Sequence, residues 1–153
     1  MKRTVSLLVA CGCLAAGGAP TAEEQGAPQF LNSGKVYPTN LPFSEAVRVG
    51  NLVYLSGQLG IVPGSMTLVP GGIKEEARQV LDNIKATLEA HGYSMRDVVK
   101  CTVMLADISE WGTFNDVYKA YFTSPHPARS AFAASGLALG ARVEVECLAA
   151  AGK

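Results

Sequence analysis

The sequence predicts an α+β fold: a single mixed β-sheet with two helices packed on one of its faces. Three observations lead to this prediction. Short segments alternate between apolar and polar residues, as half-buried strands do, and two longer segments repeat at helical spacing. These segments follow one another in the order strand, strand, helix, strand, helix, strand, strand. At 153 residues the chain has the length of one domain.

The first two strands lie within the segment EAVRVGNLVYLSGQLG, residues 45–60. Two runs of alternating character flank Gly50 and Asn51, which are typical residues of a tight hairpin turn. Gly57 and Gly60 end the second strand, and a loop rich in glycine and proline follows. We therefore expect a β-hairpin at the start of the globular part.

Two segments have the periodicity of amphipathic helices. The first, EEARQVLDNIKATLEAHG at residues 75–92, has acidic residues in its first turn, where the helix dipole favours them, and ends at Gly92. His91 lies in its last turn, and we interpret it as a solvated histidine rather than a catalytic group. The second helix is expected from about Thr113 to Phe122, where the prolines that follow end it, with Trp111 packed in the core at its start.

The later strands alternate with a period of two residues. In residues 98–106 the expected core positions are Val99, Cys101, Val103 and Leu105. In residues 141–150 they are Val143, Val145, Cys147 and Ala149. The opposite face of the sheet is mixed in character and carries Thr102, Met104, Glu144 and Glu146. A small sheet that exposes such a surface favours self-association, with polar pockets between the subunits.

Composition excludes several classes of protein. Hydrophobic residues make up 48% of the chain and charged residues 17%, which is typical of a folded core and not of a disordered chain. Thirteen basic and thirteen acidic side chains cancel, so the chain lacks the charge of a general nucleic-acid binder. The two histidines, His91 and His126, lie far apart in the sequence, and no spacing typical of a zinc or other metal site is present.

The N-terminus has the layout of a secretory signal peptide. Lys2 and Arg3 precede an apolar run, and small residues follow it, so we expect a leader over residues 1–22, a flexible tether over 23–40 and a globular domain over 41–150. No run is long enough for a membrane span. The protein is therefore expected to be exported to the periplasm or secreted. Two alternatives are a lipoprotein anchored through Cys11, and a cytoplasmic protein whose start codon lies further downstream.

Cys101 and Cys147 remain after removal of the leader. Both lie among apolar neighbours in predicted strands, which favours buried, inert thiols. A disulfide between the two after export is the alternative.

Arg129 stands out in the segment PHPARSAF, residues 125–132, where a strand begins. A guanidinium at the edge of an apolar strand is costly to desolvate unless it meets an anion. That anion is either a carboxylate of the protein, for which Glu144 and Glu146 are candidates, or the carboxylate of a ligand.

Residues 41–150 resemble the reactive intermediate deaminase family, also called RidA or YjgF-like. The resemblance rests on four segments in order: AVRVGNLVYLSGQLG, VLDNIKATLEAHGYSMRDVVKCTVMLADISEW, FNDVYKAYF, and HPARSAF with VEVECLAA. It implies a fold like that of the Bacillus chorismate mutase, a homotrimer with pockets in the clefts between subunits, and no cofactor. It also implies hydrolysis of enamines and imines such as 2-aminoacrylate to 2-keto acids and ammonia, as in 2-iminobutanoate/2-iminopropanoate deaminases.

The resemblance also implies which residues form the site. Arg129 matches the arginine that binds the substrate carboxylate, and Glu144 matches the acid associated with the attacking water. Asn115, Ser56 and Gly57 match other positions of the pocket. The chain departs from the family's GPYSQA-like segment, which here reads LPFSEA: Phe43 replaces tyrosine at a substrate-binding position, and Glu45 replaces glutamine. Ala131 stands where cysteine is frequent.

Three other functions compete with the deaminase. A non-catalytic module would use the same arginine to bind small carboxylates. An endoribonuclease, an activity also attached to this family by name, is disfavoured by the neutral charge balance and the absence of a histidine pair. A chaperone-like or interaction protein would neither bind nor turn over imines.

Overall fold

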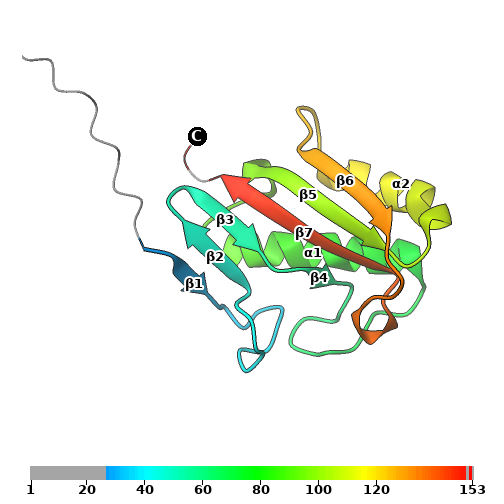
Figure 1. The fold of residues 1–153 in the computed structure, drawn as a ribbon, viewed down its shortest axis with the longest axis horizontal. Coiled ribbons are helices and arrows are strands. Elements are labelled where there is room, and N and C mark those ends of the chain that lie inside the picture. Colours follow the sequence, from blue (N-terminus) through cyan, green and yellow to red (C-terminus); the bar gives the residue numbers. More distant parts are fainter. Residues whose placement is uncertain (1–26, 151, 153) are drawn as a thin grey trace, which may run out of the picture.

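The computed structural model describes residues 27–150 and residue 152, which form one mixed sheet with two helices on one face (Figure 1). The strands lie side by side in the order β1-β2-β3-β7-β5-β6, and β4 pairs with β7 beyond the end of β3. The strands are β1 (Gln29–Leu31), β2 (Ala46–Val49), β3 (Leu52–Leu55), β4 (Gln58–Leu59), β5 (Val98–Leu105), β6 (Ala128–Ala133) and β7 (Val143–Ala150). The helices are α1 (Ile73–Ala90) and α2 (Trp111–Tyr121), with single 3₁₀ turns η1 (Met95–Asp97), η2 (Ile108–Glu110) and η3 (Ala138–Gly140).

The predicted fold class is confirmed. Only β5 and β6 run parallel, and every other pair in the described chain is antiparallel. The parallel pair needs a crossover, which α2 provides by packing on the sheet between the two strands. The β2–β3 hairpin turns at Gly50 and Asn51, as predicted.

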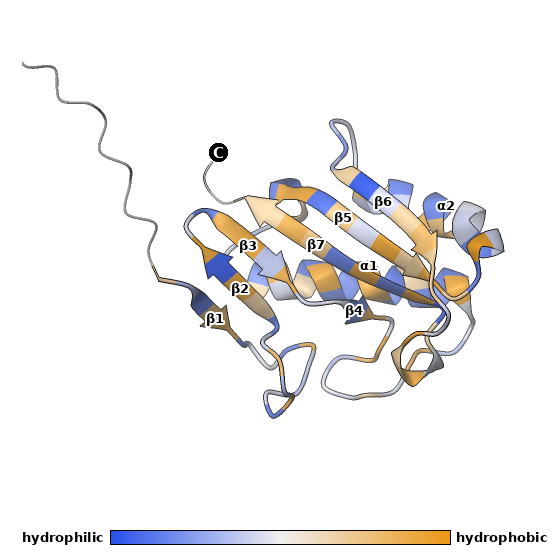
Figure 2. Cartoon of the chain, in the orientation of Figure 1, coloured by the Kyte–Doolittle hydropathy of each residue, from blue (hydrophilic) through white to orange (hydrophobic). Residues whose placement is uncertain are grey.

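The core lies between the sheet and the two helices. Figure 2 shows hydrophobic and hydrophilic bands alternating along β5 and β7. The buried residues Val103, Leu105, Val143 and Val145 face α1 and α2 in this layer, together with Phe114. Each large side chain that is fully buried contributes about 1.5–3 kcal/mol. One predicted position is wrong: an irregular register between Val98 and Lys100 buries Val98 in place of Val99.

The predicted tether over residues 23–40 is wrong from Gln29 onward. Gln29–Leu31 forms β1, which pairs with β2 at the edge of the sheet. Val36 and Tyr37 are buried in a second, smaller core with Leu59, Ile61 and Ala141. Glycine and proline in this segment make its composition resemble a linker, but its apolar residues reach the body of the domain.

The predicted leader, including Cys11, lies outside the described residues. Within the part of the chain that the structure describes, neither helix has the length and apolar character needed to span a membrane.

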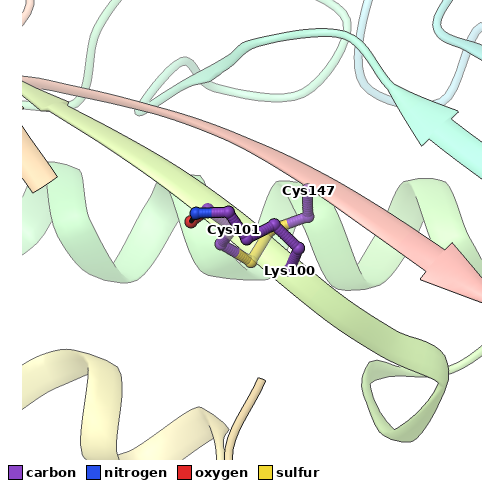
Figure 3. The surroundings of a disulfide bond; sticks show 3 residues. All are labelled: Lys100, Cys101 and Cys147. Carbon is purple, nitrogen blue, oxygen red and sulfur yellow. Dashed lines mark hydrogen bonds between the residues drawn. A yellow bond between two sulfur atoms is a disulfide. The ribbon is translucent and has the colours of Figure 1, made fainter. Parts of the chain in front are cut away.

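Cys101 on β5 and Cys147 on β7 form a disulfide, so the interpretation of both as thiols is wrong (Figure 3). The two residues are directly opposite each other in the antiparallel ladder, with Cα atoms 4.1 Å apart. The register of β5 on β7 creates this pairing, and register is a property of the assembled sheet that neither segment specifies by itself.

Candidate active site

Glu144 extends from β7 on the face of the sheet opposite the helices. Its neighbour across β5 is Met104, and its neighbour across β4 is Leu59. The carboxylate packs directly against Gly57, where an added Cβ would collide with Glu144 Oε1. Gly57 is therefore required for space, because only a residue without a side chain admits the carboxylate at this position.

Tyr37 holds Gly57 from the other side. The Tyr37 hydroxyl donates to the Gly57 carbonyl at 3.0 Å and accepts from the Leu59 backbone N–H at 3.1 Å. Burial raises the pKa of Tyr37, with a smaller contribution in the same direction from the charge of Glu144, so the phenol stays protonated and donates. Phe43 meets the Tyr37 ring edge-on, with centroids 5.5 Å apart, and is 45% exposed.

Ser56 is a structural donor in this conformation. Its hydroxyl donates to the Ser44 carbonyl at 2.6 Å, and its backbone N–H donates to the Glu45 carbonyl at 3.1 Å. These two bonds join the segment that follows β3 to the segment that contains Phe43. We define the Glu144 wall as Gly57, on which the carboxylate packs, together with Tyr37, Phe43 and Ser56, which these contacts connect to it.

Burial raises the pKa of the Glu144 carboxyl above its usual value, and the nearby charge of Glu146 raises it further. A carboxyl whose pKa is raised holds its proton to a higher pH than an exposed carboxyl does. This is the property expected of a group that passes a proton to or from a water molecule.

Arg129 lies on the helix side of the sheet, over α2. Its guanidinium carbon is 4.6 Å from the centroid of the Tyr118 ring, and it is 5.9 Å from Phe114 and 6.0 Å from Trp111. Among the described residues no carboxylate lies within salt-bridge distance of Arg129, so neither Glu144 nor Glu146 neutralises it within one chain. The aromatic faces stabilise the cation and leave its N–H donors for an anion.

Trp111, next to this cation, and Asn115 both lie on α2. Trp111 is 45% exposed, so the expectation that it packs in the core is wrong. Asn115 lies one helical turn after Trp111, and its Oδ1 is buried with no hydrogen-bond partner in the described chain. A buried oxygen without a donor is unfavourable by about 1–3 kcal/mol, which favours a ligand or water at this place.

One chain does not bring Arg129 and Glu144 together. Cys101 is paired with Arg129 on one side and with Cys147 on the other, and Cys147 lies three residues beyond Glu144. The two positions are thus about 10 Å apart across the strands and about 10 Å along them. Their side chains also point to opposite faces, because Arg129 shares the buried face of Cys101 whereas Glu144 alternates with the buried Val143 and Val145.

A separate concave surface lies away from these residues. A groove of about 940 Å³ between α1, η1 and the loop after α2 is lined by Lys85, Arg96, Phe122 and His126, and by none of the residues predicted for the site. In the described part of the chain no group of three or more side chains is arranged to hold a metal ion.

Sequence reasoning missed Tyr37, Tyr118 and the exposure of Trp111. The positions of Tyr118 and Trp111 could have been predicted from the sequence, because helical spacing places both on the side of α2 that faces the strand containing Arg129. The position of Tyr37 could not have been predicted, because only the tertiary fold brings Tyr37 to Gly57.

The chain matches known proteins over nearly all of its described length. The family model described as Endoribonuclease L-PSP matches residues 35–151. The 2-iminobutanoate/2-iminopropanoate deaminase of Bos taurus is 52% identical over 124 residues, which are 81% of this chain and 90% of the bovine protein.

Solved structures agree with the sequence comparison. RidA from an Antarctic Psychrobacter superposes with a TM-score of 0.73 at 41% identity, covering 79% of this chain and 97% of that one. TdcF of E. coli, solved with bound serine, has a TM-score of 0.71 at 29% identity, covering 80% of this chain and 98% of that one. These comparisons confirm the predicted family and the prediction of a deaminase-like enzyme, and the chain belongs to the reactive intermediate deaminase (RidA/YjgF-like) family.

Proposed function

We propose that the protein hydrolyses 2-imino acids, and the enamines that tautomerise to them, to 2-keto acids and ammonia. The observation that carries this proposal is Arg129, a cation that three aromatic rings surround and that no carboxylate among the described residues neutralises. The names of the relatives, among them the bovine 2-iminobutanoate/2-iminopropanoate deaminase, supply the class of substrate.

Arg129 binds the substrate. A guanidinium donates two parallel hydrogen bonds to a carboxylate, which fixes both the position and the plane of an imino acid. Asn115 Oδ1, which has no hydrogen-bond partner among the described residues, accepts a hydrogen bond from the substrate's nitrogen. Holding the substrate by its carboxylate places its C2 carbon at a fixed distance from the attacking water.

Glu144 positions and deprotonates the attacking water. The carboxylate orients a water molecule for attack on C2 and accepts one of its protons as the carbon–oxygen bond forms. That proton passes to the nitrogen as the carbon–nitrogen double bond becomes single, which gives a carbinolamine. The carbinolamine hydroxyl then gives up its proton through the carboxylate to the nitrogen, the carbon–nitrogen bond breaks as the carbonyl forms, and ammonia leaves with the keto acid. The imine already reacts with free water, so positioning and proton transfer by a single carboxylate suffice, and no cofactor takes part.

The complete site lies between subunits of a homotrimer, where Arg129 of one copy faces Glu144 of the next. The separation of these two residues within one chain supports this arrangement. The face of the sheet that carries Glu144 also exposes Tyr54 and Phe132, at 49% and 48%, which is an apolar surface that a second copy would cover.

Turnover tests the function. An amino-acid oxidase generates the imino acid in the assay, and semicarbazide traps what survives, with and without the purified protein. We expect the protein to reduce the trapped imine, Arg129→Ala to abolish this effect, and the matched control Arg96→Ala to retain it. Undiminished imine across several amino acids, with a folded oligomer, would contradict the proposal and favour the non-catalytic carboxylate-binding module.

Trimers that contain two different variants test whether the site is shared between subunits. Arg129→Ala and Glu144→Gln are each expected to be inactive, and trimers that contain both variants regain intact sites wherever a native Arg129 meets a native Glu144. Random mixing in a cyclic trimer restores about a quarter of the sites. No recovery in co-expressed, mass-verified mixed trimers would show that both groups act from the same chain.

We also propose that the protein is exported. The layout of residues 1–22 supports this, and so does the Cys101–Cys147 disulfide, since such bonds persist in oxidising compartments. N-terminal sequencing of the protein from a cell fraction is expected to begin near Glu23. A lipid-modified Cys11 would indicate the lipoprotein alternative, and an intact leader in the cytosol would contradict export.

Ribonuclease activity is the second candidate, because the family model carries that description. The described chain offers no histidine pair for it: His91 is bonded to Glu45, and His126 lies exposed in the loop after α2. Cleavage of RNA that survives in Arg129→Ala would support this activity as separate from imine hydrolysis.

A further inference from the structure

Glu45 is a buried carboxylate next to the Glu144 wall. Its residue is 2% exposed, and it occupies the position where the family's sequence pattern has glutamine. A carboxylate so deeply buried must be compensated by donors, since an unpaired charge in the interior is strongly destabilising.

Three donors satisfy it. The Ser33 hydroxyl lies 2.7 Å from Glu45 Oε1 and 3.0 Å from Oε2, and the Ser33 backbone N–H donates to Oε2 at 3.3 Å. The third is His91 Nε2, 3.0 Å from Oε1. The carboxylate has no donor of its own to offer, so the histidine nitrogen carries the proton in this contact.

His91 is therefore not the solvated residue that its place in the helix suggested. It is the C-cap of α1, and its side chain is 13% exposed. Gly92, with φ 82°, turns the chain away immediately afterwards, which leaves the imidazole directed at Glu45. The contact joins the end of α1 to a segment that lies 46 residues earlier in the sequence.

The hydrogen bond between His91 and Glu45 is connected to the proposed site through Ser56. The Glu45 carbonyl accepts from the Ser56 backbone N–H, and the preceding Ser44 carbonyl accepts from the Ser56 hydroxyl. Ser56 is followed by Gly57, the residue against which the Glu144 carboxylate packs. Thus His91, at the end of α1, is hydrogen-bonded to the Glu45 side chain. Segment 43–45, which contains Glu45, is in turn hydrogen-bonded to Ser56 of the Glu144 wall.

We propose that His91 is a positioning residue of the deaminase site: through the buried Glu45 carboxylate, it fixes Phe43 and the Ser56–Gly57 backbone where the substrate meets Glu144. This inference rests on the proposed function. In this chain the histidine both compensates the buried charge and joins the end of α1 to segment 43–45, so removal of the charge alone does not replace the link.

The test compares His91→Ala with His91→Gln, which keeps an N–H donor, and with His126→Ala, the matched exposed histidine. Imine turnover is measured in the semicarbazide assay over a range of substrate concentrations. We expect KM to rise about fivefold to tenfold in His91→Ala, as a hydrogen bond to a charged group is lost, with kcat within about twofold of the parent. His91→Gln is expected to recover most of the KM, and His126→Ala to leave it unchanged.

A second variant separates positioning from stability. Glu45→Gln combined with His91→Ala removes the buried charge, so thermal stability is expected to return toward that of the parent while KM stays raised. A merely structural role would lower the folded fraction, and hence the apparent kcat, and would leave KM unaltered. Native KM in folded His91→Ala, or recovery of KM together with stability in the double variant, would overturn the proposal.

A failure of the proposed function is distinguishable from a failure of this inference. Were the parent protein inactive on imines, calorimetric binding of 2-oxobutanoate, with Arg129→Ala as the blank, would replace turnover. A Kd raised about fivefold or more in His91→Ala would uphold the positioning role in a binding module. An unchanged Kd, or no binding by the parent protein, would reject it.

Discussion

The two halves of the proposed site are built in opposite ways. The Arg129 half comes from one continuous stretch, α2 and the strand that follows it, so that Trp111, Phe114, Tyr118 and Arg129 lie within 20 residues of each other. The Glu144 half combines Tyr37, Gly57 and Glu144, which are far apart in the sequence and meet only after the sheet has formed. The first half depends on local helical spacing, whereas the second depends on long-range packing.

Removal of the disulfide is expected to have the largest effect, because this bond joins the strand next to Arg129 to the strand that carries Glu144. It closes a loop of 46 residues, for which chain entropy predicts a stabilisation of about 4 kcal/mol. We expect Cys101→Ala with Cys147→Ala to lower the free energy of unfolding by about 2–4 kcal/mol in a denaturant titration. An unchanged midpoint in urea, with mass spectrometry showing the bond intact in the parent, would contradict this stabilising role.

Gly57→Ala tests the long-range half alone. The added Cβ collides with the end of a flexible Glu144 side chain and not with backbone, so the carboxylate moves away at little cost to stability. We expect kcat/KM to fall about 100-fold, equivalent to about 2.7 kcal/mol, while the melting temperature changes by a few degrees at most. The matched control is Gly112→Ala in α2, where the Cβ meets open space and activity should persist. Full activity in Gly57→Ala would exclude Glu144 from the reaction.

Trp111→Ala tests the Arg129 half of the site, and its expected effect on activity is smaller than that of Gly57→Ala. Its ring is the farthest of the three from the guanidinium, and an exposed cation–π contact contributes about 0.5–1 kcal/mol. KM is therefore expected to rise about twofold to fivefold, with Trp111→Phe close to the parent. A loss of folded protein in place of this KM effect would return Trp111 to the structural role that its sequence suggested.

The pH dependence of stability is the smallest expected effect. Burial raises the pKa of Glu144, so the folded state binds this proton more tightly than the unfolded state does. The free energy of unfolding consequently decreases as pH rises from the usual carboxyl value through the raised one. Glu144→Gln removes this loss, so its melting temperature should exceed that of the parent at pH 7, and the difference should shrink as pH falls below the usual carboxyl value. A difference that grows toward low pH would reverse the sign of the shift.

Much of the local half was predictable from the sequence. The strand segment PHPARSAF and the family motif identified Arg129, and the alternation along β7 placed Glu144 opposite the helices. Periodicity determines which face a residue occupies, because neighbouring positions in a helix or strand have fixed relative directions. The order of these elements, together with the family motifs, was sufficient for the fold class.

Register and long-range contact were decided only by the tertiary structure. From the sequence, the Cys101–Cys147 disulfide was only an alternative to free thiols, and nothing indicated that His91 reaches Glu45 or that residues 29–40 belong to the domain. Each depends on how segments distant in the chain align, and a shift of one residue in a strand would reverse every such contact. The sequence by itself therefore determined the elements and their faces, whereas packing determined which side chains meet.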